Sequence, residues 1–152
     1  DNVHEMEYLE MVLNESMRLY PPIPLHIGRW AAEERVICGK TIPAGTGVLA
    51  AVWTIHHDPA FWKDPWTFDP ERFSKENRDS IQELSWMPFG DGPRNCIGRR
   101  FALMEAKMGL VEVMMRYRLS PCHLTPSPLP VRNKGLTLSP VGDKLWLKAE
   151  NR

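Results

Sequence analysis

The chain has 152 residues, of which 43% are hydrophobic, and its 19 basic and 19 acidic residues give a formal net charge of zero. This length suits one ordinary domain, and the apolar content supports a packed core, so general disorder is excluded. The balanced charge removes any whole-chain electrostatic argument for nucleic acid or an anionic membrane and leaves only local patches.

The three cysteines, Cys38, Cys96 and Cys122, lie far apart and form no Cys-x-x-Cys pair. This usage argues against a zinc ribbon, a thioredoxin-like site or a secreted disulfide scaffold, and favours a reducing compartment. Cys38 and Cys122 are interpreted as small buried hydrophobes. The chain opens on Asp1 rather than Met and has no apolar stretch long enough for a membrane span, so we expect a piece of a larger domain with any anchor outside it.

The first helix is predicted from apolar residues at helical spacing, and it ends before Pro21 and Pro22. The helix is apolar on two sides, which is typical of a mostly buried helix. Glu15 projects into the second apolar flank, and a buried carboxylate needs a partner such as Arg18, one turn further on. An ordinary surface ion pair between these two residues is the alternative.

The middle of the chain predicts short strands and an irregular segment. Residues 35–39 and 40–42 have the pattern of a hairpin, and residues 57–77 predict an ordered meander, because their Asp-Pro pairs alternate with aromatic side chains that flexible linkers lack. Neighbouring His56 and His57 would point apart on a strand, so they are interpreted as loop or strand histidines rather than as a metal-binding pair.

The last third of the chain predicts a long helix from Arg99 to Tyr117, again apolar on two faces and therefore largely buried. A hairpin between residues 136–138 and 144–148 is expected to close the chain. Three basic residues near the start of the helix are either a solvated face or a patch for an acidic partner; they are Arg99, Arg100 and Lys107.

The loop before that helix carries the clearest chemistry. Its glycines let the backbone approach a flat partner closely, and Cys96 precedes a helix N-terminus, where the dipole and free N–H groups stabilise a thiolate. Arg94 adds a cation that suits an anionic ligand group. No His or second Cys is near enough in sequence to complete a zinc site, so a single thiolate on a metal held by a macrocycle fits better.

This loop, Phe-Gly-Asp-Gly-Pro-Arg-Asn-Cys-Ile-Gly, resembles position for position the haem-binding motif FxxGxRxCxG of the cytochrome P-450 family, the haem-thiolate monooxygenases. Glu15-Ser16-Met17-Arg18 resembles the family's ExxR pair, and Pro70-Glu71-Arg72-Phe73 resembles its PERF segment, in the family's order. The chain is most similar to the microsomal group that includes the family-three drug-oxidising enzymes and thromboxane synthase.

The resemblance implies a mainly α fold with small β-sheets, and it makes residues 1–152 the incomplete C-terminal part of a single cytochrome P-450 domain. The implied parts are the ExxR helix, the meander, the haem-binding loop, the proximal helix and the closing hairpin. The distal helix that carries the family's oxygen-activating acid–alcohol pair lies upstream of this chain, so the isolated fragment is expected to be inactive.

The resemblance also implies a set of site residues. Cys96 is the axial thiolate ligand of haem b, Arg94 and Arg29 pair with the haem propionates, and Phe89, Gly90 and Gly98 shape the loop around it. Glu15, Arg18 and Arg72 form a buried structural triad. Residues 23–28 and 134–137 line the substrate pocket, with Ile23, Leu25, His26, Ile27 and Leu136 as the lining side chains.

The implied activity is insertion of one oxygen atom from O2 into an apolar substrate, with electrons from NADPH through a cytochrome reductase that docks near Arg99, Arg100 and Lys107. The implied location is the cytosolic face of the endoplasmic reticulum membrane, reached through an upstream anchor, with no nucleic-acid partner. A thromboxane-synthase-type isomerase and a non-catalytic truncated product are the alternatives.

Overall fold

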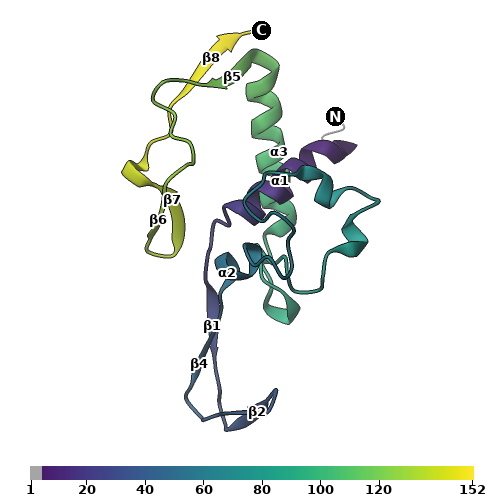
Figure 1. Cartoon of the computed structure of the whole chain (residues 1–152), viewed down its shortest axis with the longest axis vertical. Helices are drawn as coiled ribbons and strands as arrows, with labels where there is room; N and C mark the ends of the chain where they lie inside the picture. Colours follow the sequence, from purple (N-terminus) through teal and green to yellow (C-terminus); the bar gives the residue numbers. More distant parts are fainter. Residues whose placement is uncertain (1–4) are drawn as a thin grey trace.

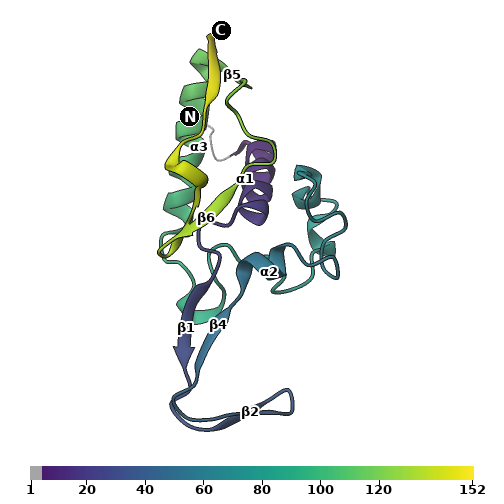
Figure 2. The same cartoon turned by 60° about the vertical axis from the view of Figure 1, so that its left-hand side comes forward.

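Two helices, α1 (Glu7–Leu19) and α3 (Arg99–Arg116), lie side by side at the centre of the molecule (Figure 1, Figure 2). The computed structural model describes residues 5–152, with the backbone alone at His26 and Ile27, so the start of the chain at Asp1 lies outside the described residues. A short helix, α2 (Val52–His56), precedes the meander. No helix within the described residues combines the length and apolar character needed to cross a bilayer.

Eight short strands pair into four separate antiparallel sheets within residues 5–152. Strand β1 pairs with β4, β2 with β3, β5 with β8, and β6 with β7. Their bounds are His26–Trp30, Arg35–Ile37, Lys40–Ile42, Gly47–Ala50, Tyr117–Pro121, Val131–Lys134, Thr137–Pro140 and Leu147–Asn151, for β1 to β8 in order. Single turns of 3-10 helix form η2, η3, η4 and η5 at Pro70–Phe73, Arg78–Ser80, Gly92–Arg94 and Val141–Asp143. The expected mainly α architecture with small sheets is confirmed.

Strand β1 depends on a glycine at its centre. A Cβ atom added to Gly28 would lie 2.8 Å from the carbonyl oxygen of Val48 and 2.9 Å from the Leu49 side chain, so β4 approaches the β1 backbone too closely for any larger residue. The register between the two strands shifts between His26 and Arg29 at this point. The sequence prediction contained no strand here.

The two main helices begin and end close to their predicted bounds, but their burial differs from the prediction. Within α3 only Lys107 is buried, whereas Phe101 is 64% exposed and Met115 is 69% exposed. In α1 the buried residues are Glu15, Arg18 and Leu19, all near its C-terminal end. The prediction of two largely buried helices is therefore wrong for this chain, because the described elements leave most apolar side chains of α3 exposed.

Three local predictions are also corrected. The closing hairpin pairs β6 with β7 around Gly135, and β8 pairs instead with β5, the strand that leaves α3. His56 ends helix α2 and His57 caps it, so neither lies on a strand. Cys38 is exposed in the β2–β3 turn with a φ of 49°, because the two-residue turn projects it away from the core.

The interior is polar rather than apolar. Its buried hydrophobic side chains are Leu19, Val52 and Trp62, whereas its buried polar and charged side chains are Glu15, Arg18, His56, His57, Ser74, Ser85 and Lys107. Buried polar groups are stable only when they are hydrogen-bonded. The packing of α1, α2 and the meander is therefore set mainly by directional contacts.

Candidate functional site

The cysteine loop, residues 89–98, folds back on itself immediately before α3. The Cys96 N–H donates to the carbonyl oxygen of Phe89 at 2.8 Å, and the Asn95 N–H donates to that of Gly92 at 3.1 Å. Gly90 and Gly92 have φ angles of 72° and 76°, which L side chains rarely adopt, so both turns need glycine. The hydrogen bond between Cys96 and Phe89 thereby joins the start of the loop to its end.

Cys96 is exposed and lies two residues before Gly98, the N-cap residue of α3. Its neighbour Ile97 is fully exposed, which places an apolar side chain in solvent beside the thiol. Among residues 5–152 no group of three or more His, Cys, Asp or Glu side chains is arranged to hold a metal ion, so these residues build no closed zinc site. A haem iron needs one axial thiolate from the protein, and an exposed thiol at a helix N-terminus fits that requirement.

Glu15, Arg18 and Arg72 meet where α1 packs against the meander. The Arg18 Nε and Nη2 atoms donate to the two carboxylate oxygens of Glu15 at 2.7 and 2.9 Å, and both side chains are fully buried. Arg72 Nε lies 3.5 Å from Glu15 Oε1, as an ionic contact without hydrogen-bond geometry. Since neither partner of the Glu15–Arg18 pair reaches solvent, the pair is not the ordinary surface ion pair that the sequence left open.

The same carboxylate also ties the meander to α1. The Asp69 N–H donates to Glu15 Oε1 at 2.9 Å, and Arg18 Nη2 donates to the carbonyl oxygen of Thr67 at 3.2 Å. Arg72 reaches its place because η2 begins at Pro70, capped by the Asp69 side chain, which accepts from the Glu71 N–H at 3.1 Å. The PERF segment is thus a single turn that presents one arginine to Glu15.

His56, which the sequence interpretation treated only as a loop or strand histidine, is a fully buried residue of this region. Its Nδ1 lies 3.2 Å from the carbonyl oxygen of Arg18, and its Nε2 accepts the Met87 N–H at 3.0 Å. Burial lowers the pKa of His56 to about 4, so the ring is neutral at physiological pH. The sequence does contain a signal for this burial. His56 follows an apolar run and precedes the Asp58-Pro59 turn, and this is the position of a residue at the end of a buried helix.

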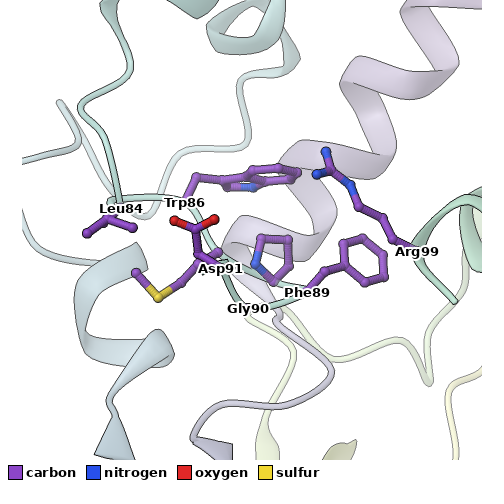
Figure 3. A pocket seen from close by; sticks show the side chains of 8 residues that line it. Leu84, Trp86, Phe89, Gly90, Asp91 and Arg99 are labelled. Carbon is purple, nitrogen blue, oxygen red and sulfur yellow. The ribbon is translucent and has the colours of Figure 1, made fainter. Parts of the chain in front are cut away.

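Arg99 lies over two aromatic rings at the start of α3. Its guanidinium carbon is 5.8 Å from the centre of the Trp86 ring and 5.9 Å from that of Phe89, within cation–π range (Figure 3). Together with Asp91 and the backbone at Gly90, these side chains line a pocket of about 150 Å³ beside the cysteine loop. Phe89 is therefore positioned by Arg99 as well as by the turn that holds Cys96.

The remaining predicted haem contacts lie around the N-terminal end of α3. Arg94 is exposed at the end of η4, two residues before Cys96. Arg29 is on β1, which lies near the same end of α3 (Figure 1), and its exposed side chain donates to the carbonyl oxygen of Gly28 at 3.3 Å. The structure thus places both arginines on exposed positions, where a bound anionic group could reach them.

One member of the predicted basic patch is not available to a partner. Lys107 is 5% exposed, and its Nζ donates to Glu10 Oε2 on α1 at 2.7 Å. Lys107 is part of the packing of α1 against α3, so the prediction that it belongs to a docking surface is wrong. Arg99 and Arg100 remain exposed.

The two segments predicted to line a substrate pocket, residues 23–28 and 134–137, are brought together by a hydrogen bond between residues that flank them. The Leu138 N–H donates to the carbonyl oxygen of Pro22 at 2.8 Å, which brings the β6–β7 hairpin to the segment that follows α1. Leu25 is 45% exposed and Leu136 is 55% exposed, while Ile23 is half-buried. The predicted side chains of His26 and Ile27 lie outside the described part of the chain.

Comparison with known proteins places these features in one family. The family model described as cytochrome P450 matches residues 1–147, so the chain belongs to the cytochrome P450 family. It is 48% identical over 145 residues to cytochrome P450 3A27 of Oncorhynchus mykiss, which covers 95% of this chain and 28% of that protein.

Two further relatives agree with this assignment. The chain is 43% identical over 152 residues to cytochrome P450 9e2 of Blattella germanica, covering 99% of this chain and 28% of that protein. It is 44% identical over 152 residues to cytochrome P450 3A7 of Homo sapiens, covering all of this chain and 30% of that protein. The chain therefore spans less than a third of the length of these relatives.

Proposed function

We propose that this chain is the C-terminal, haem-ligating part of a monooxygenase that inserts one oxygen atom from O2 into an apolar organic substrate. The observation that carries the proposal is the exposed Cys96, held at the N-terminus of α3 by a loop that is closed through the Phe89 carbonyl. Membership of the cytochrome P450 family supports haem as the cofactor. When bound, haem b supplies the activation of oxygen.

Each residue of the site has a specific role in this proposal. Cys96, two residues before the N-cap of α3, provides the thiolate that ligates the iron. Arg94 and Arg29 pair with the haem propionates. Phe89 provides an apolar wall, while Gly90 and Gly98 allow the backbone to approach the ring.

The polar network has a structural role in the same proposal. Glu15, Arg18 and Arg72 fix the meander against α1, and His56, which contacts Arg18, links this network to Met87 before the loop that carries Cys96. These three side chains do not touch the cofactor. They determine whether the protein folds into a form that can bind it.

The substrate pocket is formed in part by the joined segments after α1 and around β7. Ile23, Leu25 and Leu136 are its apolar lining, with His26 and Ile27 assigned from the resemblance alone. These side chains favour an apolar substrate. The substrate itself is set by walls that the remainder of a full-length protein provides.

Electrons come from NADPH through a cytochrome reductase that docks near Arg99 and Arg100, the two exposed cations at the start of α3.

The full-length protein lies on the cytosolic face of the endoplasmic reticulum membrane, anchored by a segment outside this chain. The apolar face of α3 is covered by other parts of that protein. The 152 residues alone do not turn over substrate.

The test is carried out on the full-length protein, recovered from a longer transcript. The reduced carbon monoxide complex should show the red-shifted Soret band of a thiolate-ligated haem, and Cys96→Ser should abolish it. Cys38→Ser and Cys122→Ser are the matched controls and should retain it. If Cys96→Ser kept the band, or Cys38→Ser lost it while folded, Cys96 would not be the ligand.

A turnover assay distinguishes the activities. Oxygenated product that requires O2, NADPH and the reductase supports the monooxygenase. Rearrangement of an endoperoxide without reductase would support the thromboxane-synthase-type isomerase instead. Turnover by the isolated 152 residues would contradict the proposal that they are incomplete.

A further inference from the structure

His56 connects two parts of the chain that are distant in sequence. On one side it meets α1: its Nδ1 lies 3.2 Å from the carbonyl oxygen of Arg18, and its own carbonyl accepts from Arg18 Nη1 at 2.8 Å. On the other side, its Nε2 accepts the Met87 N–H at 3.0 Å. Because a backbone N–H can only donate, Nε2 must be the unprotonated nitrogen, and the proton on Nδ1 donates to Arg18.

The contact with Met87 continues into the cysteine loop. The Met87 carbonyl accepts the Gly90 N–H at 3.1 Å, and the Phe89 carbonyl accepts the Cys96 N–H at 2.8 Å. Trp86, next to Met87, donates its indole N–H to the carbonyl oxygen of Asn14 at 3.3 Å. The segment from Trp86 to Gly90, which curves beneath Arg99 in Figure 3, is thus tied to α1 on one side and to the cysteine on the other.

We propose that His56 is a positioning residue, which holds Met87 against the Glu15–Arg18 pair and thereby sets where the cysteine loop presents the Cys96 sulfur. This inference rests on the proposed role of Cys96 as the haem ligand. His56 does not touch the cofactor, and it acts through the backbone of residues 87–96. Loss of the hydrogen bond from the Met87 N–H to His56 therefore changes how the sulfur ligates the iron, although no ligand is removed.

The surroundings of His56 keep its ring in the tautomer that this role requires. The charged or titratable neighbours are Arg18 on α1 and His57, the residue that caps α2, and the charge of each disfavours a second proton on the ring. The Glu15 carboxylate accepts hydrogen bonds from two of the three guanidinium nitrogens of Arg18, Nε and Nη2, so its charge is already paired. The segment from Trp86 to Gly90 carries no titratable side chain. A protonated ring would direct an N–H at the Met87 N–H and release the segment.

Two substitutions separate the two contacts. The side-chain amide of Asn reaches about as far as Nδ1 of His, and that of Gln reaches about as far as Nε2. His56→Asn can therefore still donate to Arg18 but loses Met87, whereas His56→Gln can still accept from Met87 but loses Arg18. The measurement is the ratio of thiolate-ligated to thiol-ligated haem in the reduced carbon monoxide spectrum of the full-length protein, per mole of bound haem.

His56→Asn is expected to lower that ratio about tenfold or more, the usual effect of removing a residue that orients a ligand, and His56→Gln should keep it near the wild-type value. His57→Asn and His57→Gln are the matched controls, because His57 stacks between Trp53 and Trp66 and makes its Nδ1 contact with Trp53. Both controls should leave the ratio unchanged. Equal effects of the two His56 variants, a larger effect of Gln, or failure of both to form holoprotein would overturn the inference and leave His56 as a packing residue.

An acid titration provides the second measurement if only His56→Asn fails to fold. In the wild type the thiolate band should be lost as the pH falls towards about 4, the pKa of His56, and in His56→Gln it should persist to lower pH. Loss at the same pH in both proteins would contradict the inference. Failure of the proposed function is distinguishable, since it appears as a wild-type protein without the thiolate band, or as a Cys96→Ser variant that retains it.

Discussion

Replacement of Glu15 by alanine tests the polar network most directly. The Glu15 carboxylate accepts both Arg18 nitrogens at 2.7 and 2.9 Å, accepts the Asp69 N–H at 2.9 Å and lies 3.5 Å from Arg72. Alanine removes all four contacts and leaves the Arg18 guanidinium buried without a counter-charge. The remaining acceptors of Arg18 are the carbonyl oxygens of His56 and Thr67, which carry no formal charge.

The expected loss of stability follows from these contacts. Removal of one partner from a buried ion pair costs about 3–5 kcal/mol, because the other charge stays buried. The Asp69 N–H loses its acceptor at the same time, at about 1–3 kcal/mol. Since the two effects share one site and do not simply add, we expect Glu15→Ala to lower the free energy of unfolding by about 4–6 kcal/mol. That is a large part of the about 5–15 kcal/mol typical of a folded domain.

The assay is denaturant unfolding of the full-length protein, together with the yield of haem-containing protein. Glu7→Ala is the matched control, because Glu7 lies on the same helix and pairs with Lys75, but both side chains are more than 60% exposed. That exposed pair should contribute about 0–1 kcal/mol. A Glu15→Ala protein with normal haem content and an unfolding free energy within about 1 kcal/mol of the wild type would refute the reasoning from burial.

Three further predictions concern other parts of the described chain. The pKa of His56 is about 4 in the folded protein and 6.5 in the unfolded chain, so the neutral ring stabilises the fold above pH 6.5. Up to about 3 kcal/mol of the free energy of unfolding is lost as the pH falls from 6.5 to 4. Denaturant unfolding at several pH values should show that His56→Gln reduces the dependence of this free energy on pH. Glu10→Ala leaves the buried Lys107 cation without a counter-charge and should destabilise the fold by about 3 kcal/mol. Lys107→Met leaves only the half-exposed Glu10 unpaired and should destabilise the fold by less than about 1 kcal/mol. Thermal unfolding of the two variants measures the difference. Gly28→Ala should destabilise the fold by about 1–3 kcal/mol, because the added Cβ would lie 2.8 Å from the Val48 carbonyl oxygen. An unchanged thermal unfolding temperature would show instead that β4 can move away from β1.

The sequence predicts the cysteine loop and the Glu15–Arg18 pair because their signals are local or strongly patterned. Cys96 is marked by the glycines around it and by the helix that follows within three residues. Arg18 lies one turn from Glu15 on the same helix, which makes the pair predictable from spacing. Arg72 is assigned through the resemblance of its segment, and its approach to Glu15 over a separation of 57 residues has no local signal.

The failed predictions depend on contacts between distant residues or on an apolar face that the described residues leave uncovered. Lys107 is buried because Glu10 lies opposite it, 97 positions earlier, and a lysine between methionines and alanines has no local sign of such a partner. Strand β6 is short and polar, so its pairing depends on the turn at Gly135 rather than on its own pattern. Helix α3 has an apolar pattern suited to burial, but the described chain provides no element that covers Phe101 or Met115.

The polar interior has a consequence for how the cysteine loop is held. Hydrogen bonds depend on direction as well as distance, so those of Arg18 and His56 weaken steeply when the segments that carry them shift by about an ångström. Arg18 binds the carbonyl oxygens of His56 and Thr67, and His56 binds the Met87 N–H, so α1, α2, the meander and the loop share one set of directional contacts. A thiolate that must meet a metal at one fixed distance is better positioned by such a set than by side-chain packing alone. The cost is that no member can be removed without leaving a buried polar group unpaired, so Glu15→Ala, Arg18→Ala and His56→Asn should each disturb the proposed haem ligation, although none of these side chains is proposed as a ligand.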